Sequence, residues 1–183
     1  MKISISGAQC TGKTTLIANL KEKPQFKDYE VYKSPTRILS QQYGMNFHYA
    51  NEKLQLATLI LQMENAYKQG DGIFDRSIID NLAYYEYFKV RGQTDILDNV
   101  HTFMYDCAYR LLKNIDIHFL LLPEIPLKDD GVREVNEGQR IEVTNIIRKM
   151  LTDWDIEYII LSGTIEQRAS AVMEYMFPSK SIL

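Results

Sequence analysis

Near its start the sequence places two glycines five positions apart and follows the second with a lysine and two threonines, as GAQCTGKTT (residues 7–15). The stretch MKISIS before it is β-like, and the segment after it has helical periodicity. Glycines permit a loop whose backbone N–H groups all point inward, and the positive end of the following helix strengthens their hold on an anion. Such a loop binds a polyphosphate. The residues expected to bind it are Gly7, Ala8, Gln9, Cys10, Thr11, Gly12, Lys13, Thr14 and Thr15.

Two side chains of this loop suit a nucleotide with its metal ion. Lys13 can reach the β- and γ-oxygens as a mobile point charge, and the Thr14 hydroxyl can ligate Mg²⁺, which retains several waters. The pattern G-x-x-x-x-G-K-[ST] between a strand and a helix is that of the P-loop. A glycine-containing turn in a protein that binds no nucleotide is the alternative, and the flanking strand and helix argue against it. We therefore predict ATP and Mg²⁺ as cofactors.

Three classes of P-loop protein compete for this sequence: switch GTPases, ATP-driven motors and small-molecule kinases. A switch GTPase needs D-x-x-G, and no glycine of the chain has an aspartate three residues before it. A motor needs an acidic pair at the end of an apolar strand, whereas Arg76 follows Asp75 in IFDR. The small-molecule kinases remain the favoured class.

The segment FDRSIIDNLAYYEY (74–87) supports a kinase. Asp75 is expected to end a strand beside the P-loop strand, where it can hold Mg²⁺ through water or accept a proton from an attacking hydroxyl. Arg76 then stands at the mouth of the cleft and suits an acceptor or a transferring phosphate. A structural ion pair is the alternative for both residues. We expect Lys13, Asp75 and Arg76 to be catalytic, and Thr14 with Asp75 to hold the metal.

A polar, charged segment with two arginines separates the fourth strand from the next helix. It includes DDGVREVNEGQR (129–140), with Arg133 and Arg140. A loop over about 124–140 can close on the nucleotide, deliver guanidinium groups to the developing charge and exclude water. A solvated charged loop is the alternative. We predict a lid in which both arginines are catalytic.

The residues that would contact the acceptor are expected after the second strand and on two helices. Arg37 follows a turn stiffened by Pro35 and can hold a phosphate or hydroxyl group. Gln55 and Gln62 lie two helical turns apart and can read the edge of a base through their amides. Two further candidates, Asp80 and Tyr84, lie one turn apart on the helix after DRS. Solvation or ordinary packing is the alternative for each residue.

The elements that must position these residues alternate between strand and helix. Strands are expected at 2–6, 29–33, 72–75, 117–123 and 157–161, and helices at 13–22, 51–70, 77–91, 95–113, 137–152 and from Thr164 onward. The alternation predicts a three-layer α/β fold, with five parallel strands between two layers of helices and ligands beyond the carboxyl ends of the strands. In the helix at 51–70, the spacing of Leu56, Ile60, Met63 and Tyr67 predicts the buried face.

Length and composition predict one soluble domain over residues 1–183. The chain is 45% hydrophobic with a net charge of -3, which argues against a generally basic surface for nucleic acid. The spacing of Cys10 and Cys107 suggests neither a disulfide framework nor a zinc site. No apolar run has the length of a signal peptide or a membrane span. We expect a cytoplasmic protein, with His118 as a hydrogen-bonded core histidine.

Three stretches together resemble a known family over nearly the whole chain. GAQCTGKTTL, FDRSIIDNLAYYEY and DDGVREVNEGQRIEVTNIIRKML, followed by YIILSGTIEQRASAVMEYM, resemble the small single-domain P-loop kinases related to ribosylnicotinamide kinase, which are AAA-like ATPases and kinases. The P-loop itself is shared by many families, and the arrangement D-G-x-R, then Arg, then E-x-R after the last strand is more specific. DRS also resembles the strand end of deoxynucleoside and thymidylate kinases.

The resemblance implies ATP- and Mg²⁺-dependent transfer of the γ-phosphoryl group to nicotinamide riboside, a nucleoside or a nucleoside monophosphate. It carries over Lys13 and Thr14 as phosphate and metal residues, Asp75 as metal or base residue, and Arg133 and Arg140 as lid arginines. Two other functions stay open: a kinase acting on a modified base or terminus in DNA, and a regulatory P-loop ATPase that has no small-molecule acceptor. A homodimer is also left open.

Overall fold

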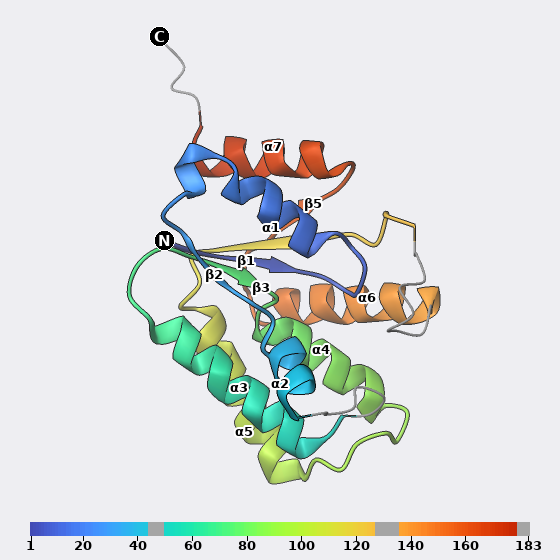
Figure 1. Ribbon diagram of the computed structural model, residues 1–183. Coiled ribbons are helices and arrows are strands. Elements are labelled where there is room, and N and C mark those ends of the chain that lie inside the picture. Colours follow the sequence, from blue (N-terminus) through green and yellow to red (C-terminus); the bar gives the residue numbers. More distant parts are fainter. Residues whose placement is uncertain (44–49, 127–135, 179–183) are drawn as a thin grey trace.

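The computed structural model describes residues 1–43, 50–126 and 136–178. Its strands form one parallel five-stranded sheet in the order β2-β3-β1-β4-β5 (Figure 1). The strands are β1 (Lys2–Ser6), β2 (Glu30–Tyr32), β3 (Gly72–Asp75), β4 (Ile117–Leu121) and β5 (Ile159–Leu161). The predicted three-layer α/β fold is confirmed. The carboxyl ends of β1 and β3 lie side by side at the centre of the sheet.

Helices cover both faces of this sheet (Figure 1). They are α1 (Lys13–Lys21), α2 (Pro35–Tyr43), α3 (Glu52–Tyr67), α4 (Ile78–Lys89), α5 (Asp98–Leu112), α6 (Glu137–Asp153) and α7 (Ile165–Met176), with a short 3₁₀ turn η1 (Pro24–Phe26). The helices α1 and α7 pack on one face, and α4 and α6 lie on the other with α3 and α5 beyond them. In the part of the chain described, no helix is both long and apolar enough to cross a bilayer.

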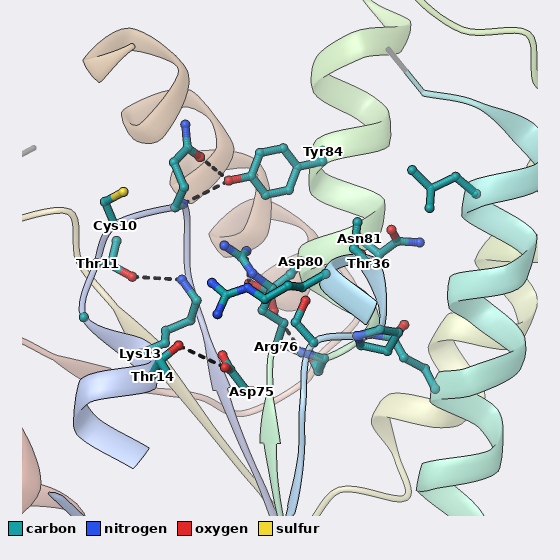
Figure 2. Close-up of a pocket in the computed structure, with 18 of the residues that line it drawn as sticks. Cys10, Thr11, Lys13, Thr14, Thr36, Asp75, Arg76, Asp80, Asn81 and Tyr84 are labelled. Atoms are coloured by element: carbon teal, nitrogen blue, oxygen red, sulfur yellow. Dashed lines mark hydrogen bonds and ion pairs between the residues drawn. The ribbon is translucent and has the colours of Figure 1, made fainter. Parts of the chain in front are cut away.

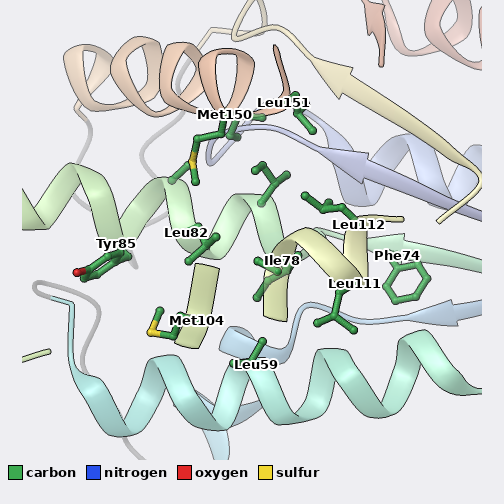
Figure 3. Close-up of a cluster of buried hydrophobic side chains, with 14 of the residues drawn as sticks. Leu59, Phe74, Ile78, Leu82, Tyr85, Met104, Leu111, Leu112, Met150 and Leu151 are labelled. Carbon is green, nitrogen blue, oxygen red and sulfur yellow. The ribbon is translucent and has the colours of Figure 1, made fainter. Parts of the chain in front are cut away.

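Strand β1 contributes side chains to both faces of the sheet, because successive side chains of a strand point to opposite faces. Ile3 and Ile5 join the core under α1 and α7, whereas Ser4 and Ser6 face the opposite side. The larger core surrounds α4, which buries most of its residues against α3, α5 and α6 (Figure 3). A helix packed on so many sides is a rigid support for polar side chains at its first turns.

The buried face predicted for α3, the stripe of Leu56, Ile60, Met63 and Tyr67, is wrong. Ile60 and Tyr67 are 63% and 61% exposed. The buried residues are Leu54, Gln55, Thr58, Leu59, Gln62 and Ala66. Half of these side chains are polar, so apolar periodicity selected the neighbouring face. The polar residues are buried because this side of α3 faces the rest of the fold and a cavity described below.

The helix α2 is an element that the sequence analysis missed. We expected only a stiff turn at Pro35, whereas Pro35 is the first residue of a helix. Proline is tolerated there, because the first turn of a helix needs no N–H donor from this position. Other differences lie at the ends of elements: β4 stops at Leu121, β5 begins at Ile159, and α6 continues to Asp153.

His118 in β4 is a hydrogen-bonded core histidine, as predicted. Its Nε2 donates to the backbone oxygen of Leu112 at 3.1 Å, so its Nδ1 is the acceptor for the Ser4 hydroxyl at 2.9 Å. Burial lowers the pKa of His118 from 6.5 to about 4, against a smaller opposing effect of the Leu112 hydrogen bond. The ring is therefore neutral in the folded protein at neutral pH.

We expect this histidine to weaken the fold in acid. Between pH 6.5 and 4 the unfolded chain binds a proton at His118 that the folded chain does not. The free energy of unfolding should then fall as pH falls, by up to about 1.4 kcal/mol per pH unit from this group. Urea unfolding at pH values from 4 to 7 gives the slope of the free energy of unfolding against pH. The part of this slope that comes from His118 should be lost in His118→Asn and retained in His101→Asn. An unchanged slope in His118→Asn would contradict the prediction.

Candidate active site

The loop between β1 and α1 adopts a backbone that its glycines make accessible. Gly7 has φ +143° and Gly12 has φ +87°, and Cys10 between them has φ +55°. A Cβ at Gly7 would lie 2.8 Å from the Leu121 carbonyl oxygen, and one at Gly12 would lie 2.7 Å from the Ile125 side chain. Both glycines are therefore required by conformation and by space.

The helix α4 holds the first half of this loop (Figure 2). The N–H of Gly7 donates to Asp80 Oδ1 at 2.8 Å, and the N–H of Gln9 donates to the Tyr84 hydroxyl oxygen at 2.9 Å. Tyr84 in turn donates to the Gln9 side chain, whose Nε2 donates to Gln139 of α6 at 2.8 Å. Asp80 and Tyr84, which we predicted to contact the acceptor, thus position the loop in this structure and also line the cavity beside it.

The ammonium group of Lys13 lies back over the same loop. Its Nζ donates to the Gly7 carbonyl oxygen at 2.8 Å, to Thr11 Oγ1 at 3.1 Å and to the Ala8 carbonyl oxygen. The residue is only 5% exposed. A buried ammonium held by neutral oxygens is well placed to exchange them for the charged oxygens of a phosphate, which are stronger acceptors.

Thr14 and Asp75 form the pair that we predicted for the metal. The Thr14 hydroxyl donates to Asp75 Oδ2 at 3.0 Å, and Asp75 ends β3 in register with Ile5 of the neighbouring β1. A hydroxyl and a carboxylate are hard oxygen ligands that fit Mg²⁺, which is commonly bound through one or two carboxylates with waters and substrate phosphates. Among the residues described there is no cluster of three or more His, Cys, Asp or Glu that would form an all-protein metal cage.

Arg76 brings a second cation to the loop. Its backbone has φ +76°, which is unusual for a residue with a side chain. Its NH1 donates to the Gly7 carbonyl oxygen at 3.1 Å and to Asp80 Oδ1 at 3.4 Å. Burial would lower the pKa of Arg76, but Tyr84, Asp80 and Asp75 outweigh burial and the pKa is raised. Because Lys13 also binds the Gly7 oxygen, two positive groups converge beside Asp75 (Figure 2).

A cavity of about 390 Å³ extends from this loop to α2 and α3. The size is typical of a small-molecule site. Its end remote from the loop is lined by Ser34, Pro35, Thr36, Arg37, Leu54, Gln55, Gln62, Asn81 and Phe88. Three buried amide atoms have no hydrogen-bond partner within the described chain: Gln55 Oε1, Gln62 Oε1 and Asn81 Nδ2. Buried polar atoms are normally paired, so these three are available to a ligand.

Most of the residues predicted for the site lie around this one cavity. The lining includes, from that prediction, Gln9, Cys10, Thr11, Gly12, Lys13, Thr14, Thr15, Arg37, Gln55, Gln62, Asp75, Arg76, Asp80 and Tyr84. Gly7 and Ala8 contribute carbonyl oxygens to Lys13 without lining the cavity. Arg140 is fully buried and donates to the Ile125 carbonyl oxygen at 3.0 Å and to Glu137 at 2.9 Å, outside the lining. Arg133 and residues 127–135 of the expected lid lie outside the described residues.

Sequence reasoning missed several lining residues, among them Asn81, Phe88 and Gln139. A usable signal existed for the first two. Asn81, Tyr84 and Phe88 recur at spacings of three and four on α4, so one helical face carries all three. Gln139 gave no such signal, because its contact with Gln9 joins residues 130 positions apart.

Comparison with known proteins places this geometry in context. A family model described as an AAA domain matches residues 2–168. No curated protein sequence matches the chain.

Solved structures share the fold at low sequence identity. NadR protein in complex with NR is 17% identical with a TM-score of 0.71; the match covers 95% of this chain and 51% of NadR, so the chain spans about half the length of that protein. Deoxyadenosine kinase from M. mycoides with bound dATP is 15% identical with a TM-score of 0.64, covering 96% of this chain and 98% of the kinase. YorR from Bacillus subtilis, in complex with phosphorylated GDP, is 16% identical with a TM-score of 0.60, covering 96% and 95%.

Proposed function

The chain belongs to the AAA domain family, and on this premise we propose that it is a P-loop kinase. It would transfer the γ-phosphoryl group of Mg·ATP to a nucleoside-like or nucleotide-like acceptor, as one domain over residues 1–183. The observation that carries the proposal is a single cavity with the glycine loop at one end and buried amides without hydrogen-bond partners among the described residues at the other. We call this second end, between α2, α3 and α4, the acceptor chamber. Asp75 and Arg76 lie between these two halves, where a phosphoryl group would pass.

The nucleotide half supplies charge neutralisation. Backbone N–H groups of the loop and the N-terminus of α1 bind the phosphates, and Lys13 turns from the loop carbonyl oxygens to the β- and γ-oxygens. Thr14 and Asp75 would hold Mg²⁺, which would neutralise charge that develops on the phosphates. Phosphoryl transfer needs little beyond such alignment and electrostatic stabilisation.

Asp75 and Arg76 would act on the acceptor side of the transferring group. The Asp75 carboxylate is 7% exposed and faces the cavity, so it can accept the proton of an attacking hydroxyl or orient a metal-bound water. Arg76 lines the cavity, so its guanidinium can leave the Gly7 oxygen for a phosphate oxygen. The lid roles predicted for Arg133 and Arg140 stay predictions, because Arg133 lies outside the described residues and Arg140 is buried against Ile125 and Glu137, outside the cavity lining.

The acceptor chamber favours a planar ring with a hydrogen-bonding edge. Gln55 and Gln62 offer amide groups from one face of α3, and Asn81 offers a third from α4. Leu54 and Phe88 supply apolar surface beside them. A nucleobase or a nicotinamide ring carries both donors and acceptors on one edge, which fits this combination. The ligands named for two structural neighbours, NR for NadR and dATP for the deoxyadenosine kinase, support a nucleoside-like or nucleotide-like ligand.

The test is an acceptor panel. The protein is incubated with γ-labelled ATP, Mg²⁺ and, separately, nicotinamide riboside, each common nucleoside, each nucleoside monophosphate or a DNA oligonucleotide, and products are identified by mass. We expect one small acceptor to gain a single phosphate. A labelled oligonucleotide would favour a DNA kinase, and free phosphate alone in every reaction would favour a regulatory ATPase.

A further inference from the structure

A fully buried arginine of α7 contacts the glycine loop from behind. Arg168 has no exposed surface, and its NH1 donates to the Thr11 carbonyl oxygen at 2.6 Å. Its NH2 donates to the Leu122 carbonyl oxygen at 3.3 Å and to Glu124 Oε2 at 3.1 Å. Arg168 does not line the cavity, so it reaches a ligand only through the loop.

The contact with Thr11 fixes the direction of one peptide group. A trans peptide is planar, and its C=O and N–H point in opposite directions. Because Arg168 draws the Thr11 carbonyl oxygen toward α7, the N–H of Gly12 points the other way, into the loop. Side chains on the same side of the loop pack closely on the Gly12 α-carbon, since a Cβ there would lie 2.7 Å from the Ile125 side chain and 2.9 Å from the Ile165 side chain.

The energetics of this arginine suggest that it does more than stabilise the fold. Its Nε has no hydrogen-bond partner in the described chain, and the side chain of its carboxylate partner Glu124 is 42% exposed. Burying a guanidinium removes its hydration, and buried ion pairs can often be replaced by apolar residues without loss of stability. Glu124 is itself held by the N–H of Gly163 at 2.7 Å, so the guanidinium is fixed in orientation.

We propose that Arg168 is a positioning residue for nucleotide binding, acting by directing the Gly12 N–H toward the phosphates. The inference rests on the proposed function only in that the loop binds a polyphosphate. Without the guanidinium, the Thr11–Gly12 peptide is free to rotate, and the glycine loop loses the Gly12 N–H as an aligned donor to the phosphates. The acceptor chamber, formed by α2, α3 and α4, is untouched by this change.

The test measures the binding of MgATP, MgADP and tripolyphosphate by calorimetry to the full chain and to Arg168→Met and Arg168→Lys. We expect Arg168→Met to raise all three dissociation constants by about tenfold or more, the effect of losing a charged hydrogen bond at the loop. Arg168→Lys retains one donor toward Thr11 and should recover part of the affinity. In steady-state assays the KM for ATP should rise while the KM for the acceptor stays unchanged.

Val172→Ala is the matched control, because Val172 is buried on α7 one helical turn after Arg168 and its aliphatic side chain can donate no hydrogen bond to the loop. It should lower the melting temperature and leave all three dissociation constants unchanged. Parental affinity in Arg168→Met would overturn the proposal, as would affinity losses that merely follow melting temperature across the three variants. Failure of the parent protein to bind tripolyphosphate or nucleotide would overturn it too, whereas tight binding without any phosphorylated acceptor would refute only the kinase assignment.

Discussion

Lys13→Ala is expected to reduce phosphoryl transfer by about 10²–10³-fold, the usual effect of removing one preorganised group that stabilises transition-state charge. Lys13 is buried at the centre of the loop and already lies within reach of its carbonyl oxygens. A phosphate bound there brings negative charge into a site that excludes much of the water, where an ammonium interacts more strongly than at a surface. Alanine leaves the loop backbone in place but removes that charge. Calorimetry with MgATP and initial rates with the acceptor found in the panel measure the loss.

Lys149→Ala is the control for this variant, because Lys149 is an exposed residue of α6 paired only with its helix neighbour Asp153 among the described contacts. It should retain parental rates and affinity. Melting temperatures must show that Lys13→Ala is folded. If folded Lys13→Ala binds and consumes ATP as the parent does, the loop is not a nucleotide site and the kinase proposal fails.

The parts of the site that the sequence predicted are those that depend on local order. The glycines, Lys13 and Thr14 lie on one continuous strand, loop and helix, so their spacing alone determines how they face a ligand. Asp75 was predicted beside them by a rule about parallel sheets, namely that ligands gather at the carboxyl ends of neighbouring strands. The pairing of β1 with β3 satisfies this rule.

The parts that the sequence did not predict depend on contacts between distant residues. Spacing put Asp80 and Tyr84 on one side of α4, but it could not tell whether that side faces an acceptor or the loop, since their partners are 73 and 75 residues away. Arg168 is the arginine of the E-x-R pattern noted in the sequence, but its contact with Thr11 joins residues 157 positions apart, so the pattern could not indicate its partner. On α3 the local signal was misleading, because polar residues occupy the buried face for which apolar periodicity is the usual marker.

Asp75→Asn is expected to lower the rate of phosphoryl transfer by about 10²–10⁴-fold, the range typical of a lost general base. The amide is nearly the same size as the carboxylate, and its oxygen can still accept the hydrogen bond from the Thr14 hydroxyl, so the fold should be retained. What disappears is the negative charge that would hold Mg²⁺ or take a proton from the acceptor hydroxyl. Asp106→Asn, an exposed position on α5, is the matched control and should match the parent.

The dependence of the rate on Mg²⁺ concentration separates the two roles of Asp75. If it holds the metal, Asp75→Asn should need a higher Mg²⁺ concentration for half-maximal rate, and excess Mg²⁺ should restore part of the activity. If it is the base, excess Mg²⁺ should not restore the rate of the variant, because the amide cannot take the proton of the acceptor hydroxyl. A rate within a few-fold of the parent at every pH and Mg²⁺ concentration would show that the Asp75 carboxylate does neither, and Arg76 and Lys13 would then be left to align the reacting groups by themselves.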